Sequence, residues 1–502
     1  MFGKSIIGKA AITVTLISLS SRVLGFLREI LFANYYGTNK EYEIYLVASI
    51  IPLTINTISI FFYQNYFIPA NAKMSVSYPE DREYFVKKTF LNSIIFAVLI
   101  VFIFLLFSEQ ILLLYAGGGL LEEKTKIVFS IFSLTMIPAI VSSFLSAYIN
   151  SKNQFGSPAL SLLFINITTI LSLVYFQSDN IIPIAIGYLV GTVLQLVYLS
   201  SKVDIKNLLK IKSPDHKDYV SISFGSIISI ILIELIGQLY VVADRFFFSS
   251  VEAGGIASLN YATNIFLLPV SIFTISLTTA IMPKISELSA KGQNKEMMEM
   301  MNKLFSLSFL FFLPFVLIFL LQGDSVVKIF LERGNFDSVS TQITKDVLFY
   351  LSLSLIFYVI YSFLNKFLYS IQKINFLLLL TIFALIIKFI LNYFLVGIFK
   401  QNGLAISTSI SYVIFFVFAF IKMRRELNLK MDKRVFNNFL FYLMNASFSF
   451  VISSIITMIL QQNQIISNLL SIIVFLVIYC VNNQIFEDEN QKMILNQIKF
   501  YK

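Results

Sequence analysis

The sequence is poor in the residues that build metal sites and thiol chemistry. Its 502 residues include one cysteine, one histidine and no tryptophan. A single cysteine excludes a disulfide within the chain, and the pair is too few for a zinc site or a Cys/His catalytic cluster. We also find no glycine-rich loop of the kind that cradles phosphates, which argues against ATP hydrolysis by this chain. Charged residues make up only 13%, against about 25% in soluble domains.

Apolar residues dominate what is present. They make up 57% of the chain, and the mean hydropathy is +0.81. Windows of about 19 residues give fourteen apolar segments between residues 10 and 484. Helices satisfy every backbone polar group inside lipid, so we predict an all-α polytopic membrane protein with 14 transmembrane helices. The first segment is too long and too charged for a cleavable signal peptide.

The charges of the predicted loops indicate an orientation. With the N-terminus inside, the inner loops and ends carry 26 Lys and Arg residues and the outer loops carry 7. Cytoplasmic loops are enriched in these residues, so we expect both termini in the cytoplasm. The net charge of +10 reflects this bias, and we expect membrane lipids rather than nucleic acid as partners.

Landmarks recur along the chain at one spacing. Arg28 precedes Pro52 by 24 residues, and Arg245 precedes Pro269 by 24 residues. This predicts two six-helix lobes in a parallel pseudo-twofold repeat, as in transporters whose substrate binds between lobes. Chance similarity in apolar sequence is the alternative. The predicted parts are residues 1–203 (helices 1–6), 204–430 (helices 7–12) and 431–502 (helices 13–14 and a cytoplasmic tail).

Ionisable residues interrupt the first apolar helix. Arg22, Arg28 and Glu29 lie inside it. Such groups cost roughly 2.5–3.5 kcal/mol each at bilayer depth, so they normally face a cavity or a partner. Two cations six residues apart, about 9 Å along a helix, suit a large anion such as a phosphorylated substrate. The alternative is an arginine that extends to the membrane interface.

Helix-breaking residues lie near these charges. Gly25 is in the first helix, and Pro52 and Pro269 are in helices 2 and 8. Proline removes a backbone donor and bends a helix, and glycine is a weak point in a helix. All three positions are therefore candidates for bends that gate a cavity. Packing alone is the alternative for either proline.

Three motifs stand out along the chain: Ser21-Arg-Val-Leu-Gly-Phe-Leu-Arg-Glu29, Ala243-Asp-Arg245 and Leu331-Glu-Arg-Gly-Asn-Phe336. They resemble the MurJ (MviN) lipid II flippase family of the multidrug/oligosaccharidyl-lipid/polysaccharide exporter superfamily. The resemblance covers roughly residues 10–425 and implies fourteen helices. It implies a transporter, not an enzyme, in the bacterial cytoplasmic (inner) membrane, which moves an undecaprenyl-diphosphate-linked saccharide outward by alternating access. We expect a monomer.

The resemblance implies roles for residues of the first two helices. Arg22 and Arg28 match cavity arginines that bind diphosphate, and Ser21 matches a small polar cavity residue. Glu29 and Glu43 stand where the family usually has aspartate, and they are expected to hold or neutralise the arginines. A guanidinium suits the role because it stays charged and binds phosphate oxygens in a bidentate fork.

Coupling is expected to differ from that of some family members, which bind sodium through an Asp in helix 7 and polar residues in helix 11. Asp244 matches the first position, but helix 11 offers Lys388 and Asn392. A sodium site is thus altered by Lys388, and we expect no cofactor. Our hypothesis is that Lys388 pairs with Asp244 as a tethered cation. In the alternative, Asp244 pairs with the arginines of the adjacent lobe, or Arg245 lies at the interface between the lobes. Lys388 is then a cavity charge unrelated to Asp244.

Competing functions remain at this stage. Two departures from the family, Asn56-Thr57 in helix 2 and Thr263-Asn264 in helix 8, replace residues that are usually charged. We take lipid II, the peptidoglycan precursor, as the expected substrate. The departures favour the alternative, a flippase or exporter of capsule, O-antigen or exopolysaccharide repeat units on the same carrier. A small-molecule exporter fits less well, because cationic drugs need carboxylates where helix 1 has arginines.

Overall fold

The chain is helical throughout the residues that its computed structural model describes. These are residues 6–116, 122–177, 180–210, 224–428, 432–460, 464–486, 488 and 490–491. The all-α prediction is therefore confirmed for this part of the chain. The helices of the first half are α1 (Ile6–Tyr36), α2 (Lys40–Phe62), η2 (Tyr63–Phe67), α3 (Ile68–Ser77), α4 (Arg82–Leu106), α5 (Ser108–Ala116), α6 (Glu123–Ser151), α7 (Gly156–Phe176), α8 (Ile182–Ser200), α9 (Ile205–Lys210), α10 (Phe224–Val242) and η4 (Arg245–Ser250).

The helices of the second half follow without a strand between the described elements. They are α11 (Gly255–Ala290), α12 (Asn294–Leu321), α13 (Gly323–Phe330), α14 (Ser338–Ser352), α15 (Leu355–Ser370), α16 (Ile374–Phe399), α17 (Gln401–Leu427), α18 (Lys433–Leu460) and α19 (Gln464–Ile485). The chain forms two compact units, residues 1–257 and 258–502. The predicted lobes and their pseudo-twofold repeat stay predictions.

Ten helices in the described residues are long and apolar enough to cross a membrane. An eleventh span is possible if α14 and α15 count as one, although they are bent by 49° at a short break. The sequence predicted one apolar segment there, over residues 346–370. The count of fourteen spans stays a prediction.

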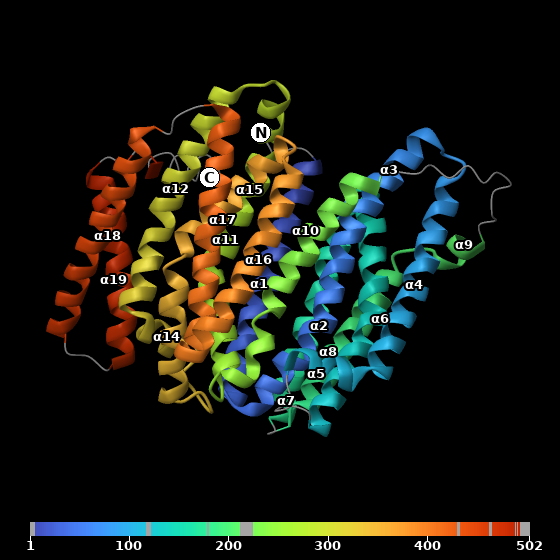
Figure 1. The fold of residues 1–502 in the computed structure, drawn as a ribbon, viewed down its shortest axis with the longest axis horizontal. Coiled ribbons are helices and arrows are strands. Elements are labelled where there is room, and N and C mark those ends of the chain that lie inside the picture. Colours follow the sequence, from blue (N-terminus) through green and yellow to red (C-terminus); the bar gives the residue numbers. More distant parts are fainter. Residues whose placement is uncertain are drawn as a thin grey trace. The chain divides into compact units, whose positions relative to one another are not determined.

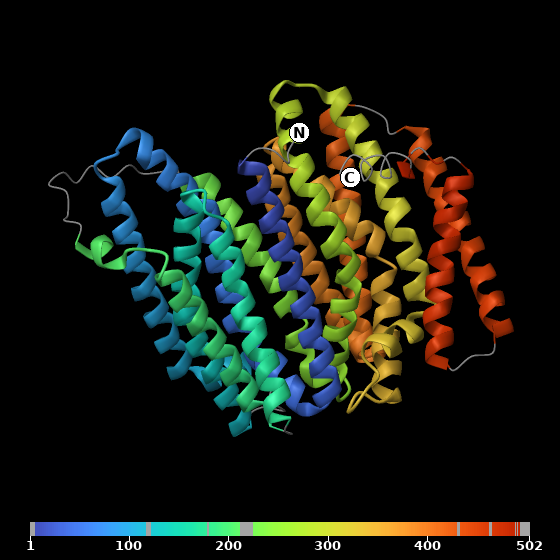
Figure 2. The ribbon, with the colours of Figure 1, turned by 180° about the vertical axis from the view of Figure 1, so that it is seen from behind.

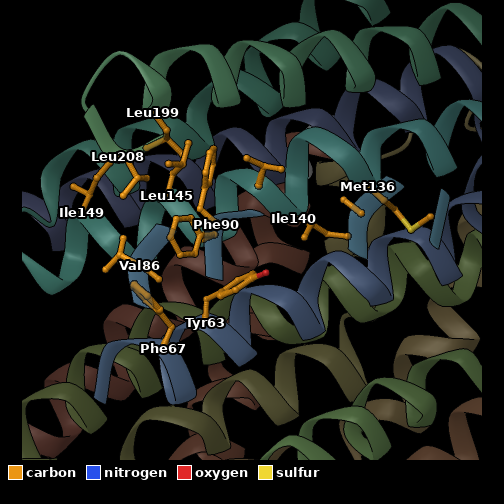
Figure 3. Packing of buried hydrophobic residues seen from close by; sticks show 14 of the residues in the cluster. Tyr63, Phe67, Val86, Phe90, Met136, Ile140, Leu145, Ile149, Leu199 and Leu208 are labelled. Carbon is orange, nitrogen blue, oxygen red and sulfur yellow. The ribbon is translucent and has the colours of Figure 1, made fainter. Parts of the chain in front are cut away.

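The core of the first unit is built around α6. Its Phe144 meets the rings of Tyr63, Phe67 and Phe90 at centroid distances of 5.7, 5.0 and 5.6 Å. Figure 3 shows Tyr63, Phe67 and Phe90 converging in this cluster. Tyr63 and Phe67 belong to η2, a π-helical turn that continues α2, and π-turns occur often at functional sites. The packing holds α2 and α4 against α6.

Two glycines bring α7 and α8 unusually close, side by side as Figure 2 shows. A Cβ atom on Gly187 would lie 2.0 Å from Ser172 Oγ. One on Gly191 would lie 2.3 Å from Thr168 Oγ1 and 2.7 Å from the Cα of Ile165. Small residues four apart allow this close approach of membrane helices. The contact fixes the face of α8 that carries Tyr188 and Thr192.

The second unit packs α17 against α14, α15 and α16. The last two helices, α18 and α19, lie side by side (Figure 1). Asn445 of α18 donates to Asn483 Oδ1 of α19 at 2.7 Å and accepts from Asn482 at 2.9 Å. Side-chain hydrogen bonds of this kind join helices in an apolar environment.

We expect the substitution Gly191→Ala to destabilise the protein by about 1–3 kcal/mol, because the new methyl group meets the backbone of α7. Thermal unfolding of the purified protein in detergent measures this change. Gly237→Ala is the control, because a Cβ atom there meets no atom within 4 Å. Alanine favours a helix over glycine by about 1 kcal/mol, so the control should be neutral or stabilising. Equal effects of the two changes would contradict the close-approach account.

Candidate functional site

Arg28 is the centre of a polar network inside the first unit. Its Nη2 donates to Glu29 Oε1 at 2.8 Å, and its Nη1 donates to Asn166 Oδ1 at 3.3 Å. The arginine side chain is 24% exposed and the glutamate side chain is 8% exposed. Ionised partners make the stronger class of hydrogen bond, and the ion pair lowers the cost of keeping a charge at this depth. The guanidinium is thus held in place, on a side chain that is still partly exposed.

One face of α1 presents this network to α7. Ser21, Gly25 and Arg28 are spaced four and three residues apart, so they share a face of the helix. Asn166 of α7 donates to the backbone oxygen of Ser21 at 3.3 Å and to its Oγ at 3.5 Å. A Cβ atom on Gly25 would lie 4.0 Å from the Asn166 side-chain oxygen. Gly25 therefore leaves room beside Asn166, and its proposed role in bending stays a prediction.

Tyrosines complete the surroundings of the ion pair. Tyr42 of α2 donates to Glu29 Oε2 at 2.7 Å, so each oxygen of this carboxylate has a described partner. Tyr45 and Tyr188 lie close enough to the Arg28 guanidinium to interact with it electrostatically. Both rings pack on Phe132, with centroids 5.1 and 5.3 Å away. The network thus links α1, α2, α7 and α8.

Arg22 is placed differently from Arg28. Six residues at 3.6 per turn separate the two side chains by about 120° around the helix axis. The side chain of Arg22 is exposed and makes no hydrogen bond or ion pair with the residues that the structure describes. A joint role of the two arginines in binding diphosphate stays a prediction.

Glu43 lies in a second buried cluster. It is 3% exposed, and its Oε1 accepts from the backbone N–H groups of Ile256 and Ala257 at 3.0 and 3.4 Å. These groups belong to the first turn of α11, where a carboxylate is favoured by the helix dipole. Glu43 therefore caps α11 from the start of α2.

Arg245 shares this cluster. It is 5% exposed, and its Nε has no hydrogen-bond partner in the described part of the chain. Asp244 and Glu43 supply opposite charges around it, and the Tyr42 and Tyr115 side chains lie within electrostatic range. The structure therefore places Arg245 with Glu43 in the first unit. Arg28 forms its ion pair with Glu29 and not with Glu43.

Lys388 and Asn392 are buried in the second unit. Lys388 is 1% exposed, and its Nζ donates to Thr408 Oγ1 at 3.0 Å. Asn392, one turn further along α16, accepts from the hydroxyl of Ser407. Both residues thus face α17. The pairing of Lys388 with Asp244 stays a prediction.

The two prolines lie inside long helices. Pro52 is buried in α2, and Pro269 is buried in α11. Their roles as bends that gate a cavity stay predictions.

Four residues of the network were not given a role from the sequence: Asn166, Tyr42, Tyr45 and Tyr188. An asparagine in the middle of the apolar segment 157–177 was the one signal available, because amides at this depth need a partner. The tyrosines carry no such signal, since 25 tyrosines are spread along the chain.

A family model for the lipid II flippase MurJ matches residues 32–481. The chain belongs to this family. The chain is 26% identical over 382 residues to a probable lipid II flippase MurJ of Buchnera aphidicola subsp. Acyrthosiphon pisum, with 73% of this chain and 74% of the relative covered. It is 25% identical over 373 residues to the lipid II flippase MurJ of Thermosipho africanus, with 72% and 74% covered.

Solved structures agree on the fold. A lipid II flippase MurJ in an inward closed conformation matches with a TM-score of 0.79 and 22% identity, over 95% of this chain and 98% of that one. An inward-facing MATE family transporter of the MOP superfamily matches with a TM-score of 0.70 and 13% identity, over 82% and 98%. The family resemblance is confirmed, and MurJ proteins are multi-pass membrane transporters rather than enzymes. The Ser21–Glu29 motif lies just before the residues that the family model matches.

We expect Glu43→Gln to destabilise the protein by about 1.5–3 kcal/mol, because it weakens hydrogen bonds of a charged acceptor and removes a negative charge near Arg245. Thermal unfolding in detergent measures the change. Glu122→Gln is the matched control, because the ion pair of Glu122 with Lys40 is half exposed and worth at most about 1 kcal/mol. A Glu43→Gln protein as stable as the control variant would refute the buried cluster as a structural support.

Proposed function

We propose that this protein is a flippase that moves an undecaprenyl-diphosphate-linked saccharide, lipid II, from the inner to the outer leaflet by alternating access. Its family and its relatives are described as lipid II flippases. The protein works as a monomer with both termini in the cytoplasm, in accord with the excess of Lys and Arg in the inner loops.

The observation that carries the proposal is the partly exposed side chain of Arg28, whose guanidinium is held by Glu29 and Asn166. A guanidinium has five donors, so Arg28 can keep its hydrogen bond to Asn166 and offer others to phosphate oxygens. A bound diphosphate replaces Glu29 as the anionic partner of Arg28, and this carboxylate keeps its hydrogen bond from Tyr42. Release of the substrate restores the ion pair with Glu29. The Arg28 guanidinium thus has an anionic partner both with and without substrate.

The membrane potential favours the outward step. With a negative interior, moving one negative charge outward gains roughly 2.3 kcal/mol per 100 mV. This is consistent with a chain that has no phosphate-cradling loop for ATP.

A second candidate function is export of other polysaccharide repeat units on the same carrier. One observation favours it: Asn56 and Thr57 stand where the resembled family usually has a basic pair, and both line an uncharged cavity. The acidic peptide of a lipid II headgroup would gain less electrostatic stabilisation in this cavity than in a positively charged one.

Complementation separates the two candidates. We expect the wild-type chain to rescue a bacterium depleted of its own lipid II flippase. Arg28→Ala should abolish the rescue, because the diphosphate loses its fixed cation. Arg28→Lys should rescue partially, since it keeps the charge without the fork. Lys366→Ala, which removes an exposed charge from α15, is the control and should rescue fully.

Two results would count against the proposal. A membrane-inserted wild-type protein that fails to rescue would favour the repeat-unit exporter. Full rescue by Arg28→Ala would remove Arg28 from the transport mechanism.

For coupling, we propose that the buried ammonium of Lys388 takes the place of a transported cation. Flipping by the wild-type protein in liposomes should then be unchanged when sodium is replaced by potassium. Lys388→Asn should make flipping depend on sodium, because an amide oxygen can coordinate a cation that the ammonium excludes. Lys366→Asn on α15 is the matched control. A Lys388→Asn variant that stays active and indifferent to sodium would contradict the idea.

A further inference from the structure

A cavity of about 500 Å³ lies inside the first unit, between α2, α6, α7 and α8. This volume is within the range of about 300–1,000 Å³ that holds small ligands. Ile60, Phe155 and Leu162 line its exposed side, with exposures of 39%, 43% and 43%. The cavity is therefore a pocket within one unit, formed by residues that the structure describes.

The lining of this pocket mixes apolar side chains with polar ones, and the polar ones are uncharged. Aliphatic hydroxyls and side-chain amides are both present: Thr57, Ser143, Ser146 and Thr192 supply hydroxyls, and Asn56, Gln64, Asn150 and Gln195 supply amides. Among the described lining residues, the one ionisable group is the Tyr188 hydroxyl, which is neutral at physiological pH. A pocket for an anion or a cation would carry a counter-charge, and a pocket for a lipid tail would avoid buried amides.

Some polar groups of the pocket are incompletely hydrogen-bonded within the described residues. The side-chain oxygens of Asn56 and Asn150 are buried without a hydrogen-bond partner in the described residues. The hydroxyls of Thr57 and Ser143 donate to the carbonyls of Leu53 and Ala139 at 3.0 and 2.8 Å, so their oxygens are left as acceptors. A buried acceptor without a partner costs roughly 1–3 kcal/mol. The amides offer donors as well as acceptors, so a ligand rich in hydroxyl groups, which both donate and accept, would match this lining.

The pocket adjoins the Arg28 network. Tyr188 lines the pocket and lies within electrostatic range of the Arg28 guanidinium. Ile165 also lines it, and the next residue, Asn166, accepts from Arg28. A ligand with a phosphate at Arg28 can therefore place its neighbouring group in the pocket.

We propose that this pocket is a saccharide subsite, which receives a neutral sugar ring of the lipid-linked substrate whose diphosphate lies at Arg28. The inference rests on the proposed function for the identity of the carrier. Sugar hydroxyl and acetamido groups both donate and accept, as the amides and hydroxyls of the lining do, and the rings of Tyr188 and Phe155 offer apolar faces for a pyranose.

Binding of two lipids to the purified full-length protein tests the proposal. The probes are lipid II and undecaprenyl diphosphate, which has the same charged group without sugar. Asn56→Leu, a change of similar size, should weaken lipid II binding about tenfold and leave undecaprenyl diphosphate binding unchanged. Arg28→Ala should weaken both. Asn65→Leu is the matched control, because Asn65 follows on the same helical segment, is exposed and lies outside the pocket.

Three outcomes of this binding test would overturn the saccharide subsite: equal affinity of the wild-type protein for the two lipids, an equal loss for both in Asn56→Leu, or no loss in that variant.

If the protein binds neither lipid, the proposed function fails. A second readout then tests the pocket independently of that function. Cys480 is the single cysteine, so Cys480→Ser with Thr57→Cys places one reactive thiol in the pocket. Free N-acetylglucosamine should slow its reaction with a maleimide, and Asn56→Leu should remove this protection. Unchanged labelling in the presence of the sugar would then overturn the subsite independently of the carrier.

Discussion

The ion pair between Arg28 and Glu29 is the interaction on which the functional account depends. A charged side chain in an apolar helix needs a partner, and in this chain the partner is the next residue. Adjacent residues of a helix point in different directions, so Glu29 needs Tyr42 and Arg28 needs Asn166 to hold both groups in place. The arrangement leaves the Arg28 side chain as a whole 24% exposed, so it is not completely enclosed by its partners.

In the first unit, the charged side chains and the uncharged polar side chains of the pocket lie in different places. Arg28 and Arg245 lie in two buried clusters, linked through Tyr42, whose hydroxyl binds Glu29 and lies within electrostatic range of Arg245. The pocket between α2, α6, α7 and α8 adjoins the first cluster and carries amides and hydroxyls. A substrate with a diphosphate next to sugar rings has the same order of chemistry, so one unit can recognise both parts.

The sequence predicted the features that depend on local composition. Hydropathy predicted helices, and the arginines in the first apolar segment indicated an anion. The break between α14 and α15 was missed because residues 347–361 on both sides of it are mostly apolar and contain no proline or glycine. The bond between Arg28 and Asn166 was missed because 138 residues separate the partners, and only packing brings them together. Two further features were missed because packing brings together residues that are apart in the sequence. They are the placement of Glu43 at the start of α11 and the glycine contact of α7 with α8.

The central claim is that this chain alone moves a diphosphate-linked saccharide across a bilayer. Reconstitution of the purified protein into liposomes that contain fluorescent lipid II, without ATP, tests it most directly. The account predicts that lipid II placed in one leaflet becomes accessible to a membrane-impermeant quencher on the other side, at a rate that increases with protein content. A folded, inserted protein that leaves the lipid in its original leaflet would contradict the account.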